Sequence, residues 1–561
     1  MKKIFIIIAI LISQNSFSQT NQFRYPLDVP PSLSANFGEL RPNHFHSGID
    51  LKTQAVVNKP VYSIADGYIS RINISPSGYG LALYINHPDG KTSVYGHLNS
   101  YAPAIAKYIK EEQYKQERYS IDIILDQNKI SVKKGDLVAY SGNTGSSMGP
   151  HVHFEIRKTD TQEALDPLPF FKNVLMDTQQ PIIKGIAVYP IEGKGVINNS
   201  DKPFRQTITT LKNGNYSTIK EDINAWGVIG VGINAIDKMN GTTNVYGVKK
   251  VNLFCNDTEI WSYNMSSFLF EQSRMINSFI DFDYWYNKKS FYMKSYIEPG
   301  NKLPLYKSIN NGYIEIKEER TYNIRYELED LYGNKTTYSF SIIGKKQDIP
   351  QPQKCSQVLA WDQNNHYISD NFSIIIPKDR LYTDVGLILQ ETANTGFQSN
   401  LYTVHNSYVP LNDYCDMKIK MTKDSIANKS QYGIVRVHNG KEYWIGGTYN
   451  NGYMNTKIRE LGHTYAVSFD TKAPTITAVQ PAKWVSLSKI TIKVIDNKSG
   501  IKSYRGTIDG KFVLFEHDSK SPTYIYKFDP TRLKKGNNHK LVFVATDACG
   551  NESQYEYSFK Y

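Results

Sequence analysis

Apolar and polar residues alternate along most of this 561-residue chain, in short runs separated by glycine, proline and asparagine. Residues 61–70 form one such run, with a turn at 66–67, and residues 81–86 form another before the turn at 88–90. Alternation with a period of two puts apolar side chains on one face of a strand. The pattern predicts a mainly β protein that begins with an antiparallel β-sheet domain.

One segment departs from the alternation. Between residues 104 and 116, Ile105, Tyr108 and Ile109 recur at helical spacing among glutamate and lysine residues. That spacing gathers apolar side chains on one side of a helix. We expect an amphipathic helix inserted into the first domain.

Beyond residue 172 the chain remains rich in strand patterns and poor in histidine. Two segments with similar sequences, 177–182 and 470–476, each precede a series of strands. Spaced strands and turns of this kind favour immunoglobulin-like β-sandwiches. We expect a first β domain at 19–172, a sandwich module at 173–346, a β domain of undefined type at 347–468 and a second sandwich at 469–561.

Recurrent turns in these modules begin with aspartate and end with glycine or asparagine, at 237–241, 330–334, 496–500 and 547–551. Their carboxylates are compatible with Ca²⁺, but turn chemistry alone explains them. Aromatic residues also crowd the segment 261–306. We expect them to pack in the core and between modules, with a sugar-binding platform as the alternative.

The N-terminus has the pattern of a secretory signal peptide. Lys2 and Lys3 precede an apolar run at 4–12, and Ser16 and Ser18 are small residues at the −3 and −1 positions of a cleavage site. The apolar run is shorter than the roughly twenty residues that a spanning helix needs. We expect residues 1–18 to be removed before Gln19, leaving a periplasmic or secreted chain without a transmembrane segment.

Charge and cysteine content restrict the function classes. The formal net charge of +12 favours anionic surfaces such as wall polymer or lipid head groups, or simply keeps the surface soluble. Export and the lack of a compact basic cluster argue against nucleic acid. None of the four cysteines lies in the histidine-rich segment, which excludes a cysteine nucleophile there. Cys355 and Cys415 are equally compatible with a disulfide and with separate buried thiols.

Six of the twelve histidines lie between His44 and His153. His46 and Asp50 are four residues apart and His151 and His153 are two apart, and even spacing puts side chains on one face of a strand. Catalytic Zn²⁺ is held by three nitrogen or carboxylate ligands and keeps one open position. Together with His97, this segment supplies three metal ligands and two further imidazoles, which indicates a hydrolytic zinc site.

The surrounding motifs strengthen this interpretation. They are His46-Ser-Gly-Ile-Asp50, Pro60-Val-Tyr-Ser-Ile-Ala-Asp-Gly67, Tyr95-Gly-His-Leu98, Gly142-Asn-Thr-Gly145 and Gly149-Pro-His-Val-His-Phe-Glu155. In this order, across residues 35 to 160, the sequence resembles the lysostaphin/LytM-type zinc endopeptidases that cut peptidoglycan cross-links. The downstream modules are not part of the resemblance.

The resemblance implies a role for each residue of the cluster. His46, Asp50 and His153 become the ligands of Zn²⁺. His151 becomes the general base for the water that the metal activates. His97 becomes a second catalytic imidazole, which stabilises the tetrahedral intermediate and passes a proton to the departing amine.

Other residues near the motifs receive weaker assignments. His44 and His87 match no catalytic position, and we expect them at the protein surface or in the groove that binds substrate. Arg41 and Asn43 precede the first ligand, and we expect them to contact substrate. The inserted helix lengthens a loop that borders the cleft in simpler relatives, so it bears on substrate specificity.

The sequence therefore predicts an exported zinc metalloendopeptidase that hydrolyses peptide cross-links of bacterial peptidoglycan. One alternative is a non-catalytic wall-binding or amidase-activating protein that retains the peptidase fold. Another is an adhesin or scaffold whose C-terminal β modules bind the wall or a protein partner.

Overall fold

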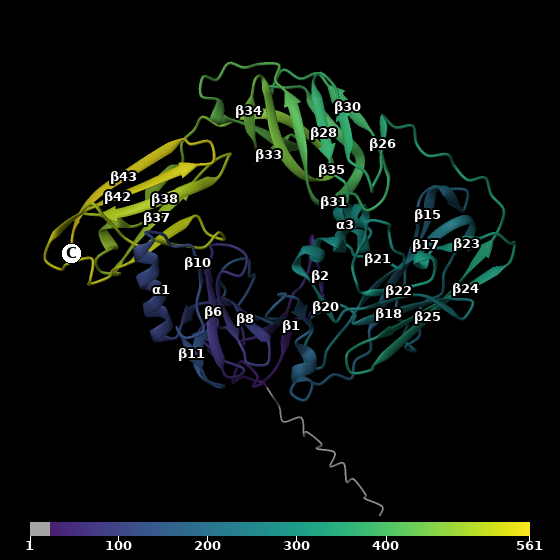
Figure 1. Cartoon of the computed structure of the whole chain (residues 1–561), viewed down its shortest axis with the longest axis horizontal. Helices are drawn as coiled ribbons and strands as arrows, with labels where there is room; N and C mark the ends of the chain where they lie inside the picture. The colour runs from purple at the N-terminus through teal and green to yellow at the C-terminus, as the bar shows by residue number, and fades with distance from the viewer. Residues whose placement is uncertain (1–22) are drawn as a thin grey trace, which may run out of the picture.

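The computed structural model describes residues 23–561, and strands dominate it. The predicted signal peptide and its cleavage point lie outside the described residues. Within residues 23–561, no helix combines the length and apolar character needed to cross a membrane. The β modules follow one another around a ring, and the C-terminal module returns to the N-terminal domain (Figure 1).

The first domain contains the predicted antiparallel sheet, in the order β1-β4-β13-β8-β7-β6-β10. Its strands are β1 (Leu33–Ala35), β4 (Ile49–Lys52), β13 (His151–Lys158), β8 (Lys91–Leu98), β7 (Leu81–Asn86), β6 (Gly67–Ile74) and β10 (Ile121–Ile124). A smaller sheet holds β5 (Pro60–Tyr62), β12 (Leu137–Tyr140) and β9 (Ser100–Tyr101). Both sheets contribute to one core, in which Val61, Leu83, Val138 and Phe154 are fully buried.

The short elements β2 (Leu40–Arg41) and β3 (His44–Phe45) form a hairpin before the first ligand, and β11 (Ser131–Val132) pairs with β6. The predicted helix is confirmed as α1 (Pro103–Lys115). Pro103 is favourable at the start of α1, because a backbone N–H in the first turn has no hydrogen-bond acceptor within the helix and proline lacks this N–H. Ile105, Ile109 and Gln113 are buried at a spacing of four, which fixes the face that α1 turns to the domain.

The second module is a ten-stranded sheet with the main order β16-β15-β17-β25-β24-β18-β19-β22. Its strands are β15 (Ile182–Ile197), β16 (Phe204–Thr207), β17 (Asn224–Ile236), β18 (Lys250–Cys255), β19 (Thr258–Asn264), β21 (Met293–Lys294), β22 (Tyr306–Ser308), β23 (Ile314–Ile316), β24 (Thr321–Glu329) and β25 (Lys335–Gly344). Two short helices follow β19, α2 (Ile276–Phe279) and α3 (Phe282–Lys288).

Aromatic residues of the segment 261–306 pack as predicted. Trp261, Tyr263 and Phe279 are almost fully buried in the second module. Tyr286 of α3 lies against Tyr408 of the third module, with ring centroids 3.7 Å apart. This segment therefore joins two modules.

The first domain and the second module share their cores. Phe37 and Phe45 pack in the hydrophobic cluster of the second module, while Met239 and Tyr246 pack in that of the first domain. In addition, β14 (Ala164–Leu165) pairs with β20 (Ser267–Phe268). The second module thus packs directly against the N-terminal sheet and helps to hold it in place.

The third module is an eight-stranded sheet around two long strands, β31 (Leu401–Lys420) and β35 (Tyr453–Phe469). The other members are β27 (Asn365–Ile368), β28 (Phe372–Ile376), β30 (Leu389–Thr392), β32 (Tyr432–His438), β33 (Lys441–Gly446) and β34 (Thr448–Asn450). Strands β26 (Gln357–Leu359) and β29 (Val385–Leu387) form a separate pair.

The C-terminal module is a sandwich of two four-stranded sheets, as predicted. One holds β36 (Thr475–Ala478), β37 (Lys489–Ile495), β41 (Thr523–Lys527) and β40 (Glu516–His517). The other holds β39 (Lys511–Phe512), β38 (Ile501–Ile508), β42 (Asn538–Asp547) and β43 (Glu552–Lys560). Ile492 of the first sheet and Phe543 of the second are fully buried in one shared core.

The C-terminal module packs against helix α1 and the residues that follow it. Lys110 Nζ lies 2.7 Å from Asp529 Oδ2, and the Tyr114 ring meets the Phe512 ring edge to face. Just beyond the helix, Glu117 pairs with Arg505 at 2.5 Å. These contacts close the ring, and they join segments about 400 residues apart in the sequence.

The acidic turns close as turn chemistry predicts. Asp330 Oδ1 accepts the backbone N–H groups of Tyr332 and Asn334, and Asp547 does the same for residues 549 and 551. Oxygens of Asp177, Asp237 and Asp330 gather within 4.8 Å, as do those of Asp470, Asp496 and Asp547. Ca²⁺ binding by these turns stays a prediction.

All four cysteines are free thiols, and Cys415 and Cys549 are buried. Of the two possibilities for Cys355 and Cys415, the structure has the separate thiols.

Candidate active site

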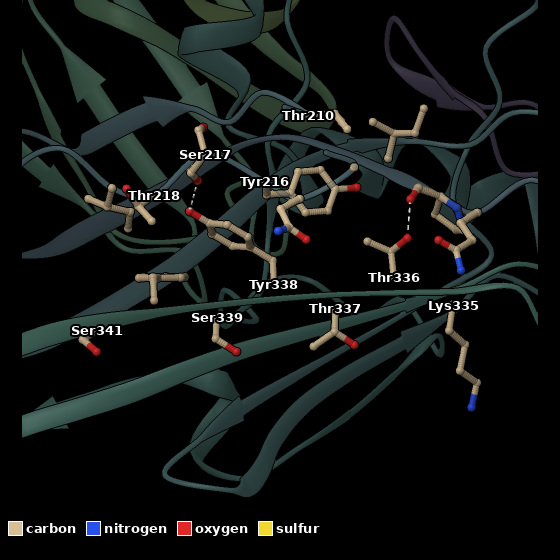
Figure 2. A pocket seen from close by; sticks show the side chains of 17 residues that line it. Thr210, Tyr216, Ser217, Thr218, Lys335, Thr336, Thr337, Tyr338, Ser339 and Ser341 are labelled. Carbon is tan, nitrogen blue, oxygen red and sulfur yellow. Dashed lines mark hydrogen bonds between the residues drawn. The ribbon is translucent and has the colours of Figure 1, made fainter. Parts of the chain in front are cut away.

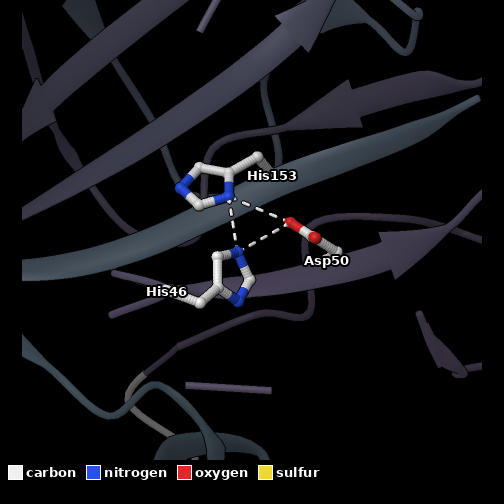
Figure 3. Close-up of side chains that lie close together, drawn as sticks. All are labelled: His46, Asp50 and His153. Atoms are coloured by element: carbon white, nitrogen blue, oxygen red, sulfur yellow. Dashed lines mark hydrogen bonds and ion pairs between the residues drawn. The ribbon is translucent and has the colours of Figure 1, made fainter. Parts of the chain in front are cut away.

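Strand pairing brings the predicted metal ligands together. Strand β13 lies between β4 and β8, with His153 opposite Asp50 on one side and opposite Gly96 on the other. Directly opposed residues on antiparallel strands project to the same face of the sheet. His46 approaches from the segment before β4, so that three side chains distant in sequence point at one another (Figure 3).

The three ligand atoms are in mutual contact. His46 Nε2 is 3.1 Å from Asp50 Oδ1 and 3.0 Å from His153 Nδ1, and His153 Nδ1 is 2.9 Å from Asp50 Oδ1. All three residues are at most 4% exposed. A carboxylate and two imidazoles buried this closely form a candidate metal group.

The spacing of the donors suits zinc. Zinc binds nitrogen and carboxylate oxygen at about 2.0–2.2 Å, so the edge of its coordination tetrahedron is about 3.3 Å. The donor distances of 2.9–3.1 Å are close to that edge. The two nitrogens and one oxygen therefore fit Zn²⁺ and leave a fourth position for water or substrate.

Each ligand is oriented by a second hydrogen bond on its far side. The Nδ1–H of His46 donates to the backbone carbonyl of Asn36 at 2.7 Å. Asp50 Oδ2 accepts from Arg41 Nη2 at 2.9 Å. His153 Nε2 lies 2.7 Å from Glu155 Oε1. Outer partners of this kind fix the tautomer and the direction of a metal-binding imidazole.

Glu155 is the centre of a buried hydrogen-bond network that the sequence analysis did not assign. Its side chain is inaccessible to solvent, and Ser47 Oγ and Tyr79 OH both donate to Oε1 at 2.6 Å. Arg157 Nε donates to Oε2 at 2.6 Å. The signal was the spacing of His153, Glu155 and Arg157, because alternate residues of one strand share a face.

The electrostatics favour a neutral His46 beside an ionised Asp50. Burial lowers the pKa of His46 to about 4, despite the attraction of the carboxylate. Burial by itself would raise the pKa of Asp50, but the surrounding imidazoles hold it well below its usual value. Burial also opposes protonation of His153, yet hydrogen bonds to Asp50 and Glu155 outweigh it and raise its pKa to about 9.

His97 and His151 form a second pair of rings beside the ligands, with centroids 4.8 Å apart. His97 Nδ1 lies 2.8 Å from the Thr144 carbonyl, and His151 Nδ1 lies 2.8 Å from the Gly149 carbonyl. A carbonyl oxygen only accepts hydrogen bonds, so each Nδ1 carries the proton and each Nε2 is a free acceptor. His151 Nε2 faces the metal position, 3.5 Å from Asp50 Oδ1.

His97 holds a rare backbone conformation, with φ of 57°. Left-handed geometry in a non-glycine residue costs free energy and persists only where the surroundings impose it. Burial and the neighbouring imidazoles lower the pKa of His97 to about 3, which keeps the ring neutral.

The remaining predicted residues take different positions. Arg41 binds the ligand Asp50, and Asn43 Oδ1 accepts hydrogen bonds from Arg274 and Asn277 of the second module. Substrate contact by Arg41 or Asn43 stays a prediction. His44 is exposed, as expected.

The prediction for His87 was wrong. His87 is only 6% exposed, and its ring nitrogens contact the Asp66 carbonyl and Ser93 Oγ. Two polar partners allow this imidazole to be buried in the domain, so it lies neither at the surface nor in a groove.

The second module has a cavity of about 720 Å³ beside β25 (Figure 2). It is lined by hydroxyl, amide and aromatic side chains, among them Tyr216, Thr336 and Tyr338. Of the strongly acidic or basic residue types, only Lys335 lines it. This cavity therefore has no carboxylate or imidazole for acid–base chemistry.

Comparison with known proteins agrees with this geometry. Residues 44–115 and 118–167 match the model of peptidase family M23, and residues 356–470 match that of the Zu5-like domain. An uncharacterized metalloprotease of Haemophilus influenzae is 30% identical over 141 residues, which cover 24% of this chain and 24% of that protein. The DD-carboxypeptidase/endopeptidase Mpg of Neisseria meningitidis serogroup B is 30% identical over 112 residues, 20% of each chain.

Lysostaphin of Staphylococcus simulans is 28% identical over 131 residues, 23% of this chain and 22% of that protein. The solved structure of its catalytic domain is 25% identical, covers 25% of this chain and 92% of that one, and has a TM-score of 0.20. The chain spans about a quarter or less of the length of these curated relatives.

Gly48 provides a test of the ligand geometry. A Cβ at this position would lie 2.2 Å from the Phe154 carbonyl oxygen, so Gly48→Ala must push the segment that carries His46 and Asp50 away from β13, which carries His153. We expect this variant to lose most of its bound zinc, measured by metal analysis after dialysis. Gly149→Ala is the control, because a Cβ there meets nothing within 4 Å. Equal zinc retention in the two variants would contradict the proposed strand contact.

Glu155 provides a test of the outer network. Glu155→Ala removes the acceptor of His153 Nε2 and leaves Arg157 buried without its partner. Loss of such a partner weakens metal binding by roughly 10–100-fold, which competition with a chromogenic chelator would measure. Glu163→Gln, which breaks the surface pair with Lys158 away from the ligands, should bind zinc as the wild type does.

Proposed function

Because residues 44–167 form a peptidase family M23 domain, we propose that this protein is a zinc metalloendopeptidase that hydrolyses peptide cross-links of bacterial peptidoglycan. The observation that carries the proposal is the complete set of five side chains: a buried ligand triad and two imidazoles with free Nε2 atoms. A non-catalytic relative would have no need to keep all five.

The position of each residue indicates its role in the reaction. His46 Nε2, Asp50 Oδ1 and His153 Nδ1 would hold Zn²⁺, which when bound polarises a carbonyl and lowers the pKa of water towards 7. His151 presents Nε2 towards the metal position and accepts the proton of the attacking water. His97, on β8, also has a free Nε2 atom. The proton that His151 or His97 gains is then returned to the departing amine.

Peptidoglycan as substrate is supported by a further relative, the peptidoglycan DD-endopeptidase ShyA of Vibrio cholerae, which is 28% identical over 140 residues. We also propose a periplasmic or secreted location, from the signal-peptide pattern of residues 1–18. The β modules that follow the peptidase domain would then contact the wall or a protein partner.

Cleavage of purified cross-linked muropeptides, followed by mass spectrometry, tests the proposal. The wild type should release uncross-linked products. His153→Ala should lose both zinc and activity, whereas His151→Ala should keep zinc and lose roughly 10²–10⁴-fold in rate, the range for a missing general base. His438→Ala changes an exposed histidine of the third module and should leave both unchanged. Full cleavage by His153→Ala would refute the assignment.

The pH profile is a second test. Proton acceptance by His151 and binding of Zn²⁺ by His46 and His153 both require neutral imidazole, and imidazole side chains gain protons as the pH falls below neutrality. The rate of cleavage should therefore rise between pH 5 and pH 7 and be highest at neutral to mildly alkaline pH. A rate that still increased as the pH fell below 5 would contradict a histidine base.

A further inference from the structure

The C-terminal module touches the loop that holds His97. The loop 142–146 of the first domain carries Thr144, whose carbonyl accepts the Nδ1–H of His97. Against the outside of this loop lies the turn 518–521, between β40 and β41 of the C-terminal module. Residues more than 370 positions apart thus meet next to a catalytic imidazole.

Asp518 and His97 bind opposite ends of a single peptide unit. Asp518 Oδ2 accepts the backbone N–H of Gly145 at 3.1 Å. That N–H belongs to the same planar amide as the Thr144 carbonyl, which accepts from His97. Rotation of this amide would break both hydrogen bonds, so Asp518 fixes the direction of the acceptor that orients His97.

Charge adds to the geometric effect. A carboxylate at the N–H end polarises the amide and makes its carbonyl oxygen a stronger acceptor, because linked hydrogen bonds reinforce one another. The His97 tautomer with the proton on Nδ1 is thereby favoured, and Nε2 stays free. The Asp518 side chain is 31% exposed and its Oδ2 lies 3.4 Å from Lys520 Nζ, so water and this ammonium group screen part of the effect.

The neighbouring contacts hold the loop in the same orientation. Lys520 Nζ donates to the carbonyl of Gly145 at 2.7 Å and to that of Asn143, on either side of Thr144. On the other flank, Ser146 N donates to the Gly78 carbonyl at 2.8 Å. The loop is thus clamped between the C-terminal turn and the loop of residues 76–80.

We propose that Asp518 is a positioning residue for the peptidase site, acting through the Thr144–Gly145 peptide to orient His97. The inference rests on the proposed function and adds to it: the C-terminal module completes the catalytic centre of the N-terminal domain. It makes this module part of the enzyme mechanism in addition to any binding role.

The kinetic test compares Asp518→Asn and Asp518→Ala in the full-length mature chain. Asp518→Asn keeps the shape and one acceptor oxygen and removes the charge, so it also covers the case in which Asp518→Ala does not fold. We expect kcat for muropeptide cleavage to fall about tenfold in Asp518→Ala, the order seen for loss of an outer partner, and less in Asp518→Asn. KM and zinc content should stay within twofold of the wild type.

The control is Arg505→Gln, which removes the ion pair with Glu117 at the same interface and does not touch the loop. It should leave kcat unchanged, because an exposed pair contributes little to docking. If Arg505→Gln lowered kcat as much as Asp518→Ala, general loosening of the module would explain the result and the positioning role would be refuted.

A measurement without substrate separates this proposal from the proposed function. Ring ¹⁵N chemical shifts of histidine-labelled protein, with the His97 signal identified from its loss in His97→Gln, report the tautomer. We expect the Nδ1–H form in the wild type and a mixture of tautomers in Asp518→Ala. An unchanged His97 signal together with unchanged kcat would overturn the positioning role, while a wild type that cleaves no muropeptide would overturn the proposed function.

Discussion

The antiparallel pairing of β13 with β4 on one side and β8 on the other is the constraint on which the site depends. It places His153 directly across from Asp50, and it puts β8, the strand that carries His97, on the opposite side. Backbone hydrogen bonds fix this register, since a slip of one residue would turn every side chain to the other face of the sheet. The site is therefore as rigid as the buried core beneath it.

Sequence alone could predict most of the side chains that meet in the candidate metal group, because their spacing signals are local. The spacing of two places His151 and His153 on one face of β13, and α1 followed from its apolar spacing. The spacing of four between His46 and Asp50 does not correspond to a common strand, because His46 lies in the segment before β4. His97 required the resemblance, since no periodicity relates it to the other residues. The burial of His87 was missed because its partners, the Asp66 carbonyl and Ser93, are set by tertiary structure.

Outer partners were the least predictable part of the site. The carbonyl of Asn36 orients His46, while the side chain of Asn36 exchanges two hydrogen bonds with Gly247 of the second module. One residue thus links a metal ligand to a neighbouring module. Such contacts leave no pattern in the sequence, because an asparagine that joins two modules cannot be told from an asparagine in an exposed loop.

The ring arrangement explains why the site is supported from two directions. The second module fixes the ligand side through Asn36 and the shared cores, and the C-terminal module fixes the His97 side through the loop at Thr144. His97 needs this second support more than the ligands do. Its left-handed backbone is unfavourable by itself, whereas His46 and His153 are held by buried partners within the domain. A strained residue near the end of a strand keeps its conformation only if the surrounding loops cannot relax, and the C-terminal module packed against the loop 142–146 supplies that restraint.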